Sequence, residues 1–96
     1  MTSQAVTAAS LPILEHLRNV MASAATNRSY MCGLIRGLDI AVETLSCASD
    51  RLEPQRRIKQ LQERAARVDN DDDYHFACTT AMRLAADLID GVAHEL

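Results

Sequence analysis

Apolar residues recur at intervals of three and four along nearly the whole chain, and this spacing strongly limits what the chain can fold into. An α-helix turns once every 3.6 residues, so the spacing places these side chains on one helical face. No segment of any length alternates apolar and polar residues as a half-buried strand does. The sequence therefore predicts an all-α fold, a small bundle or open array of three to four helices.

The first helix is expected to begin near Ser10. Its hydroxyl can cap the helix, and Pro12 then falls in the first turn, where no amide donor is needed. Residues 1–9 are small and polar and carry no apolar stripe, so we expect a flexible N-terminal segment there. With 96 residues there is room for one domain, and residues 10–96 are predicted to form a single helical domain.

Three further helices follow from proline and capping signals. The second and most apolar helix covers about residues 30–52. Pro54 favours a first helical turn and opens the third helix, whose narrow apolar seam ends at Val68. The aspartate-rich run 69–73 can cap the fourth helix and meet the positive end of its dipole. That helix continues to the C-terminus.

The second helix contains two glycines four residues apart, Gly33 and Gly37, in the stretch YMCGLIRGLDIAVETL. Each interior glycine costs a helix roughly 0.5 to 1 kcal/mol relative to alanine. A strip without side chains lets two helix axes approach closely, either within the chain or between two chains, and the spacing leaves both open. The wide apolar surface around the glycines favours a contact between chains, and hence a homodimer. The predicted protein-binding residues are Tyr30, Gly33, Leu34, Ile35, Gly37, Leu38 and Val42.

Charge is unevenly distributed around the third helix. Residues 51–67 contain six basic and two acidic residues, and residues 69–73 contain four aspartates. A basic helix can lie along phosphates, so a nucleic-acid-binding accessory protein that uses the basic helix 56–67 is the alternative function. Aromatic residues for base stacking are missing from this segment, and a solvated surface helix is the simpler interpretation. The candidate rim or nucleic-acid contacts are Arg56, Arg57, Lys59, Arg64 and Arg67.

Two groups of residues suggest metal binding. Asp69, Asp71 and Asp73 alternate like the first ligands of a calcium loop, but the positions that need glycine and glutamate hold Tyr74 and Thr80. A helix cap is the better interpretation of these aspartates.

His75 and Cys78 are three residues apart and could share a site with Cys32 or Cys47, although no CxxC or HxxxH spacing supports it. A nucleophile beside a base, or a glycine-rich loop after a strand, is not evident either. We therefore expect no metal, no cofactor and no enzymatic activity.

The compartment is expected to be the cytoplasm. Three cysteines at unrelated spacings do not suggest a disulfide framework, and the chain does not open on a charged and then apolar signal segment. No apolar run approaches the roughly 20 residues that cross a bilayer. The net charge of −3 gives no general attraction to nucleic acid or to acidic membranes.

The segments GLDIAVETLSCASDRL and DDDYHFACTTAMRLAADLIDGVAHEL resemble small helical anti-activators of pseudomonad quorum sensing. The resemblance runs from about Tyr30 to the end of the chain. It implies a protein that binds the ligand-binding domain of a LuxR-type transcription activator and covers the surface through which that domain dimerises. Such an activator needs two copies to bind a two-fold operator, so the expected result is inhibition without chemistry.

Overall fold

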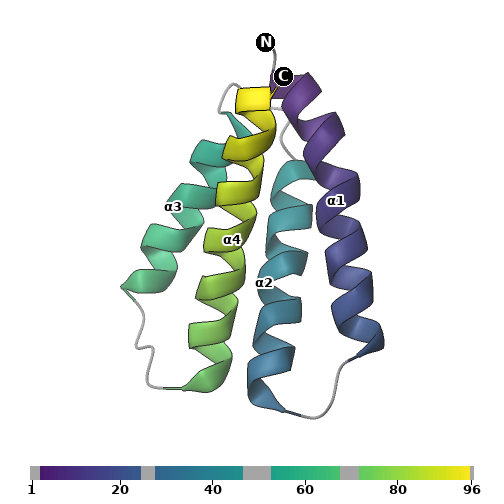
Figure 1. Ribbon diagram of the computed structural model, residues 1–96. Coiled ribbons are helices and arrows are strands. Elements are labelled where there is room, and N and C mark those ends of the chain that lie inside the picture. The colour runs from purple at the N-terminus through teal and green to yellow at the C-terminus, as the bar shows by residue number, and fades with distance from the viewer. Residues whose placement is uncertain (1–2, 25–27, 47–52, 68–71, 96) are drawn as a thin grey trace.

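The computed structural model describes residues 3–24, 28–46, 53–67 and 72–95, and these residues are almost entirely helical (Figure 1). The helices are α1 (Ser3–Ser23), α2 (Ser29–Ser46), α3 (Pro54–Ala66) and α4 (Asp73–Glu95). This confirms the predicted all-α class and the small helical bundle. Within the described ranges, none of the helices is both long and apolar enough to span a bilayer.

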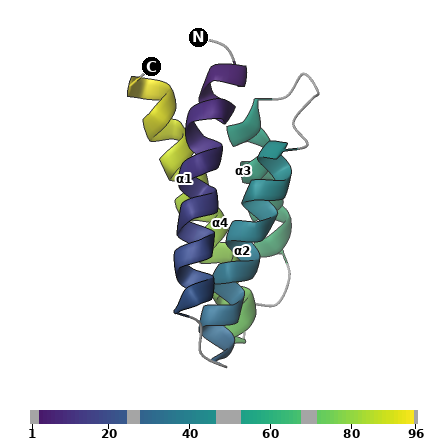
Figure 2. The same ribbon diagram turned by 90° about the vertical axis from the view of Figure 1, so that its right-hand side faces the viewer.

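Consecutive helices run in opposite directions, so α2 and α4 run parallel to each other (Figure 1). Among the four described helices, the contact between α2 and α4 is the most extensive, while α1 and α3 barely touch. Figure 2 shows α1 lying beside α2, with α4 behind it. The extents of 39 × 30 × 21 Å describe a flattened bundle. It is flattened because α2 and α4 meet at the centre of the bundle and keep α1 and α3 apart.

The close contact of α2 with α4 depends on Gly33 and Gly37. A Cβ atom on Gly33 would touch the carbonyl oxygen of Tyr74 and lie 2.8 Å from the Cβ of Ala77. A Cβ atom on Gly37 would touch the carbonyl oxygen of Cys78, one turn further along α4. Both contacts are shorter than carbon atoms tolerate, so only glycine fits at either position. Gly33 and Gly37 therefore pack against α4 of the same chain. The prediction that these glycines lie at a contact between two chains is wrong.

The start of α1 differs from the sequence-based expectation. The helix begins at Ser3 and not near Ser10, and Pro12 lies inside it. Val6, Ser10 and Leu14 follow one another at intervals of four residues and are all buried, so this face anchors the helix to the core. The flexible segment expected at residues 1–9 is thus helical from Ser3 onwards. Burial of the face offsets the missing amide of Pro12, which costs a helix interior about 3 kcal/mol.

The other helix starts agree with the sequence. Pro54 occupies the first turn of α3, and α4 begins at Asp73, within the aspartate-rich run. Ile58 of α3 is fully buried, as the predicted seam requires. Several expectations lie outside the described residues: the end of the second helix, Val68, Cys47, and Asp69 and Asp71 of the proposed calcium loop.

Candidate protein-binding groove

An apolar groove lies between α1 and α4, with α2 beneath it. Its volume is about 280 Å³. Leu34 and Leu38 of α2 form its floor and are almost completely buried. We call this feature the α1–α4 groove, and its lining residues are Leu14, Leu17, Met21, Leu34, Leu38, Ala81, Leu84, Ala85 and Leu88.

The rim of the α1–α4 groove exposes large apolar side chains. Leu84 of α4 is 60% exposed, and Leu17 of α1, which also lines the groove, is 40% exposed. Ile13 and Val20 stand four residues before and three residues after Leu17, so they continue its row along α1. They are 43% and 51% exposed. Four of the six large apolar side chains exposed within the described ranges thus lie in or beside this groove.

The opposite flank of α1 is closed against α2. Arg18 lies next to Leu17 in the chain but projects about 100° away from it around the helix. Its Nε atom lies 3.5 Å from Oδ1 of Asp39 on α2. This pair is partly exposed and contributes little stability, at most about 1 kcal/mol. It lies on the side of α1 that contacts α2, and the contact of α1 with α4 is the less extensive of the two.

The predicted protein-binding residues are distributed over three environments. Gly33 and Gly37 face α4, and Val42 is buried, whereas Leu34 and Leu38 form the floor of the groove. Ile35 is half-buried and Tyr30 is exposed. The prediction assumed that this face of α2 is exposed to a partner, and this is wrong for most of the predicted residues. The reason is that the wide apolar surface of α2 is covered by α1, α3 and α4 of the same chain.

The sequence interpretation missed the exposed residues of the groove. Ile13 and Val20 stand beside the stripe that holds α1 to the core, and Leu84 stands beside the alanines of α4. A signal was present, because these residues make the apolar faces of α1 and α4 wider than one helix contact needs. The apolar face of the second helix is wider still, but the other three helices cover it.

The basic residues lie on the outer side of α3. Arg56, Lys59, Arg64 and Arg67 are exposed and Arg57 is half-buried. Nζ of Lys59 lies 3.6 Å from Oδ2 of Asp90 on α4, so this cation is partly neutralised. Arg64 and Arg67 border a shallow polar depression together with Gln60 and Glu63. The surface is therefore of mixed charge.

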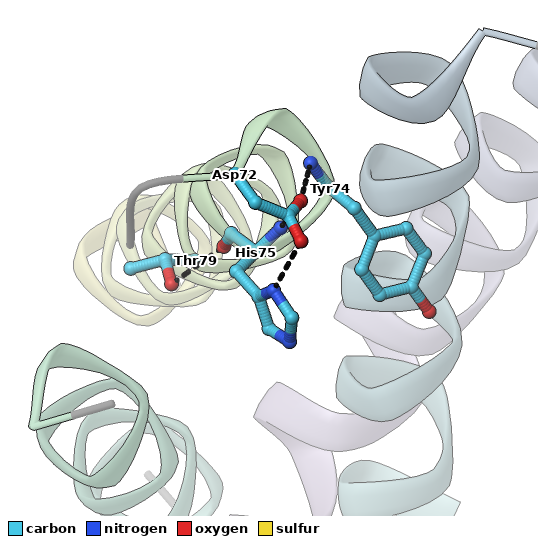
Figure 3. A network of polar contacts seen from close by, with 4 residues as sticks. All are labelled: Asp72, Tyr74, His75 and Thr79. Carbon is cyan, nitrogen blue, oxygen red and sulfur yellow. Dashed lines mark hydrogen bonds and ion pairs between the residues drawn. The ribbon is translucent and has the colours of Figure 1, made fainter. Parts of the chain in front are cut away.

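Polar contacts gather at the start of α4, where Figure 3 shows the side chains of Asp72, Tyr74, His75 and Thr79. The amide of Tyr74 donates to Oδ1 of Asp72 over 2.7 Å, and Oδ2 lies 3.1 Å from Nδ1 of His75. The hydrogen bond from the Tyr74 amide is the largest cause that lowers the pKa of the Asp72 carboxyl group; desolvation opposes it, and the hydrogen bonds and charge of His75 lower the pKa further. This is the predicted helix cap, contributed by Asp72.

The residues considered for metal binding do not assemble in the described part of the chain. There, no three His, Cys, Asp or Glu side chains lie close enough to hold a metal ion. Burial raises the pKa of the Cys78 thiol, which favours the protonated form, with a smaller opposing effect of Arg36. Cys78 is half-buried and Cys32 exposed, and neither forms a disulfide with a described residue.

The described residues thus define a flattened four-helix bundle with an open apolar groove on its side. Comparison with protein-family models, with curated proteins and with solved structures gives no match.

Proposed function

We propose that this chain is a non-enzymatic protein-binding inhibitor that uses the α1–α4 groove to bind a LuxR-type transcription activator. The observation that carries the proposal is the groove itself, an apolar channel with four large side chains exposed on and beside its rim. Contiguous exposed apolar surface is unfavourable in water and in soluble proteins commonly marks an interaction site. A partner that covered Leu84 and Leu17 would remove this surface from water.

The choice of partner comes from the sequence resemblance. The resemblance includes the anti-activator QslA, which binds the LuxR-type activator LasR. By this analogy the inhibitor occupies the dimerisation surface of the activator's ligand-binding domain, and the activator then cannot place two subunits on its operator. The mechanism needs no catalytic group, only an apolar surface that competes with a second activator subunit.

A homodimer in the cytoplasm completes the proposal. The glycines no longer argue for the homodimer, because Gly33 and Gly37 face α4 of the same chain. The exposed apolar rim is assigned to the activator, so the homodimer stays a prediction from the sequence. Sedimentation velocity over a range of protein concentrations tests the homodimer, and a monomer at all concentrations would remove it.

The test is direct binding to the purified ligand-binding domain of a LuxR-type activator, followed by gel retardation of operator DNA. Leu84→Glu places a charge on the groove rim and should weaken binding at least tenfold. Phe76→Glu is the matched control, because Phe76 is also on α4 and 54% exposed but does not line the groove. Absence of a complex with the unmodified chain would refute the proposal, and equal loss in both variants would refute the assignment to the groove.

The alternative function, nucleic-acid binding through α3, stays a prediction. It is favoured by the exposure of Arg56, Arg64 and Arg67. Such binding should weaken steeply with salt, because each phosphate contact releases counterions. Filter retention of duplex DNA at low salt measures it, and no retention under those conditions would exclude it.

A further inference from the structure

Helix α1 carries two irregularities close together, at Ser10 and Pro12. Ser10 is fully buried, and its Oγ atom has no hydrogen-bond partner among the described residues. Pro12 lies inside the helix and has no amide hydrogen, so the carbonyl group of Ala8 lacks the donor that a regular helix supplies four residues on. A buried polar group without a partner and a proline in a helix interior each destabilise the folded form. Both residues therefore act against α1 at its observed length.

The same two residues would be favourable in a helix that began at Ser10. Serine is a preferred N-cap residue, and its Oγ atom would then accept a hydrogen bond from the amide of Ile13, three residues on. Pro12 would lie in the first turn, where amides have no acceptor within the helix and the fixed φ angle of proline is suitable. The chain thus contains two starts for α1, at Ser3 and at Ser10. The structure shows the first start, and the second would remove both irregularities.

The segment between the two starts, residues 3–9, has few contacts that hold it to the core. Val6 is its only large apolar residue and is 6% exposed, so it is well buried. Gln4, Ala5 and Ala8 are exposed. A helix of so few residues is not stable in water without tertiary contacts. The helical form of this segment therefore depends mainly on the burial of one valine side chain.

The rest of α1 is held more firmly. Leu14 is fully buried, and Leu11 packs against the same core. Further along, Arg18 pairs with Asp39 of α2. These contacts all lie beyond Ser10, so they persist if residues 3–9 leave the core.

Residues 3–9 lie at one end of the bundle. Figure 1 shows the first turns of α1 beside the last turns of α4, with the start of α3 at the same end. Leu45, Ile58 and Ile89 lie towards this end of α2, α3 and α4, and they belong to the same buried cluster as Val6. None of these three side chains is more than 1% exposed. Withdrawal of Val6 would therefore open this end of the apolar cluster to water.

We infer that residues 3–9 form a detachable strap over this end of the bundle. In the closed form the strap is helical and Val6 covers the core. In the open form the strap leaves the core, α1 begins at Ser10, and the other helices stay packed. The α1 residues that line the α1–α4 groove all lie beyond Ser10, so the inference does not depend on the proposed function.

Hydrogen exchange of the backbone amides, measured by NMR on the full-length chain, tests the strap. In the observed helix the amides of residues 7–11 donate to carbonyl groups of the strap, whereas amides from Leu14 onwards donate to Ser10 and later residues. Residues 7–11 should exchange roughly tenfold faster than residues 14–18, while α2 and α4 keep their protection. Equal exchange rates in the two parts of α1 would overturn the inference.

Two variants distinguish the strap from ordinary fraying at a helix end. Pro12→Ala supplies the missing amide to the longer helix and removes the proline from the first turn of the shorter one. Exchange at residues 7–11 should then slow by roughly tenfold or more. Ser10→Ala removes the unpartnered hydroxyl group from the closed form and the cap from the open form, and should slow the same exchange several-fold. Unchanged or faster exchange in either variant would overturn the inference.

Two further variants complete the test. Ser23→Ala is the matched control for Ser10→Ala, because Ser23 is exposed near the other end of α1 and should leave exchange at residues 7–11 unchanged. Val6→Ala weakens the closed form, so the same amides should exchange several-fold faster while α2 and α4 stay protected. A loss of protection throughout the chain in Val6→Ala would overturn the inference, because residues 3–9 would then unfold only together with the whole core.

Discussion

The two sides of α4 differ in how closely they are packed, although a helical glycine lies at each of them. On the side of α2, Gly33 and Gly37 receive the backbone of α4 so closely that an added methyl group would collide. On the side of α1, Gly91 faces open space and Leu84 projects into solvent. Close packing covers the first side, whereas α1 covers the second side only in part. A helical glycine therefore indicates that close approach is possible, and only the neighbouring element determines whether it occurs.

The difference follows from the flattened shape of the bundle. Because α2 and α4 meet along the short diagonal, α1 cannot contact both of them equally. It contacts α2 more extensively, and Arg18 pairs there with Asp39, while its smaller contact with α4 leaves the groove between them. The tight contact and the open groove are thus two consequences of one arrangement.

The largest expected effect is that of Gly37→Leu. Four added carbon atoms would have to fit where a single Cβ already touches the Cys78 carbonyl and lies 2.6 Å from the Cβ of Ala81. We expect a loss of about 4 kcal/mol or more, the range reserved for severe core disruption, and hence an unfolded or loosely packed chain. Circular dichroism with urea unfolding measures it. Gly91→Leu is the control and should remain folded; cooperative unfolding of Gly37→Leu at the midpoint of the unmodified chain would contradict the close α2–α4 contact.

Truncation of a buried and of an exposed leucine, both in the lining of the groove, should come next in size. Leu14 is fully buried, so Leu14→Ala should destabilise the chain by about 3 kcal/mol through lost burial and a residual cavity. Leu84→Ala removes a side chain that is mostly in water and should cost less than about 1 kcal/mol. Urea unfolding of both variants gives the comparison. Equal losses would mean that Leu84 is covered in solution, as it would be in a homodimer.

Single methyl additions provide a finer comparison. Gly37→Ala should destabilise by about 2 kcal/mol, since overpacking outweighs the gain in helix propensity. Gly91→Ala should stabilise by about 0.5 to 1 kcal/mol, because it gains the propensity and meets no neighbour. Thermal unfolding of the two variants should therefore shift in opposite directions. A shift in the same direction would show that the two flanks of α4 do not differ as described.

The smallest effect concerns the cap of α4, which lies at the end of both flanks. The pKa of Asp72 is lowered below its ordinary value of 3.8 in the folded chain, chiefly by the Tyr74 amide. Its stabilisation should therefore be fully present above pH 5, decline as the pH falls past 3.8 and vanish below the folded pKa. Asp72→Asn keeps a capping oxygen at every pH and should flatten this part of the profile. Urea unfolding between pH 6 and pH 2 tests it, and identical profiles would contradict the role of the carboxylate.

Much of the fold could be predicted from local signals. Spacings of three and four residues indicated four helices, Pro54 marked the start of α3, and the aspartate run marked the start of α4. The start of α1 could not be predicted, because a serine and a proline within one turn give a strong local signal for a helix start. The burial of Val6 and Ser10, which extends α1 to Ser3, depends on contacts with distant segments.

The candidate site was predicted less well. Leu34 and Leu38 were among the expected binding residues. They do line the groove, but they form its buried floor and not its exposed rim. The exposed residues, Ile13, Leu17 and Leu84, come from helices whose apolar faces looked narrower than that of α2. A sequence shows how wide an apolar face is, but not how much of it the rest of the chain will cover.

By itself, the sequence determined the helical class, the positions of most helix starts and the presence of surfaces without side chains. These depend on residues within one or two turns of each other, so they can be inferred locally. Only the tertiary structure decided that Gly33 and Gly37 lie against α4, that Gly91 lies against nothing, and that the groove opens between α1 and α4. The reason is that helices are paired by which faces bury the most area together, and that choice depends on all four at once.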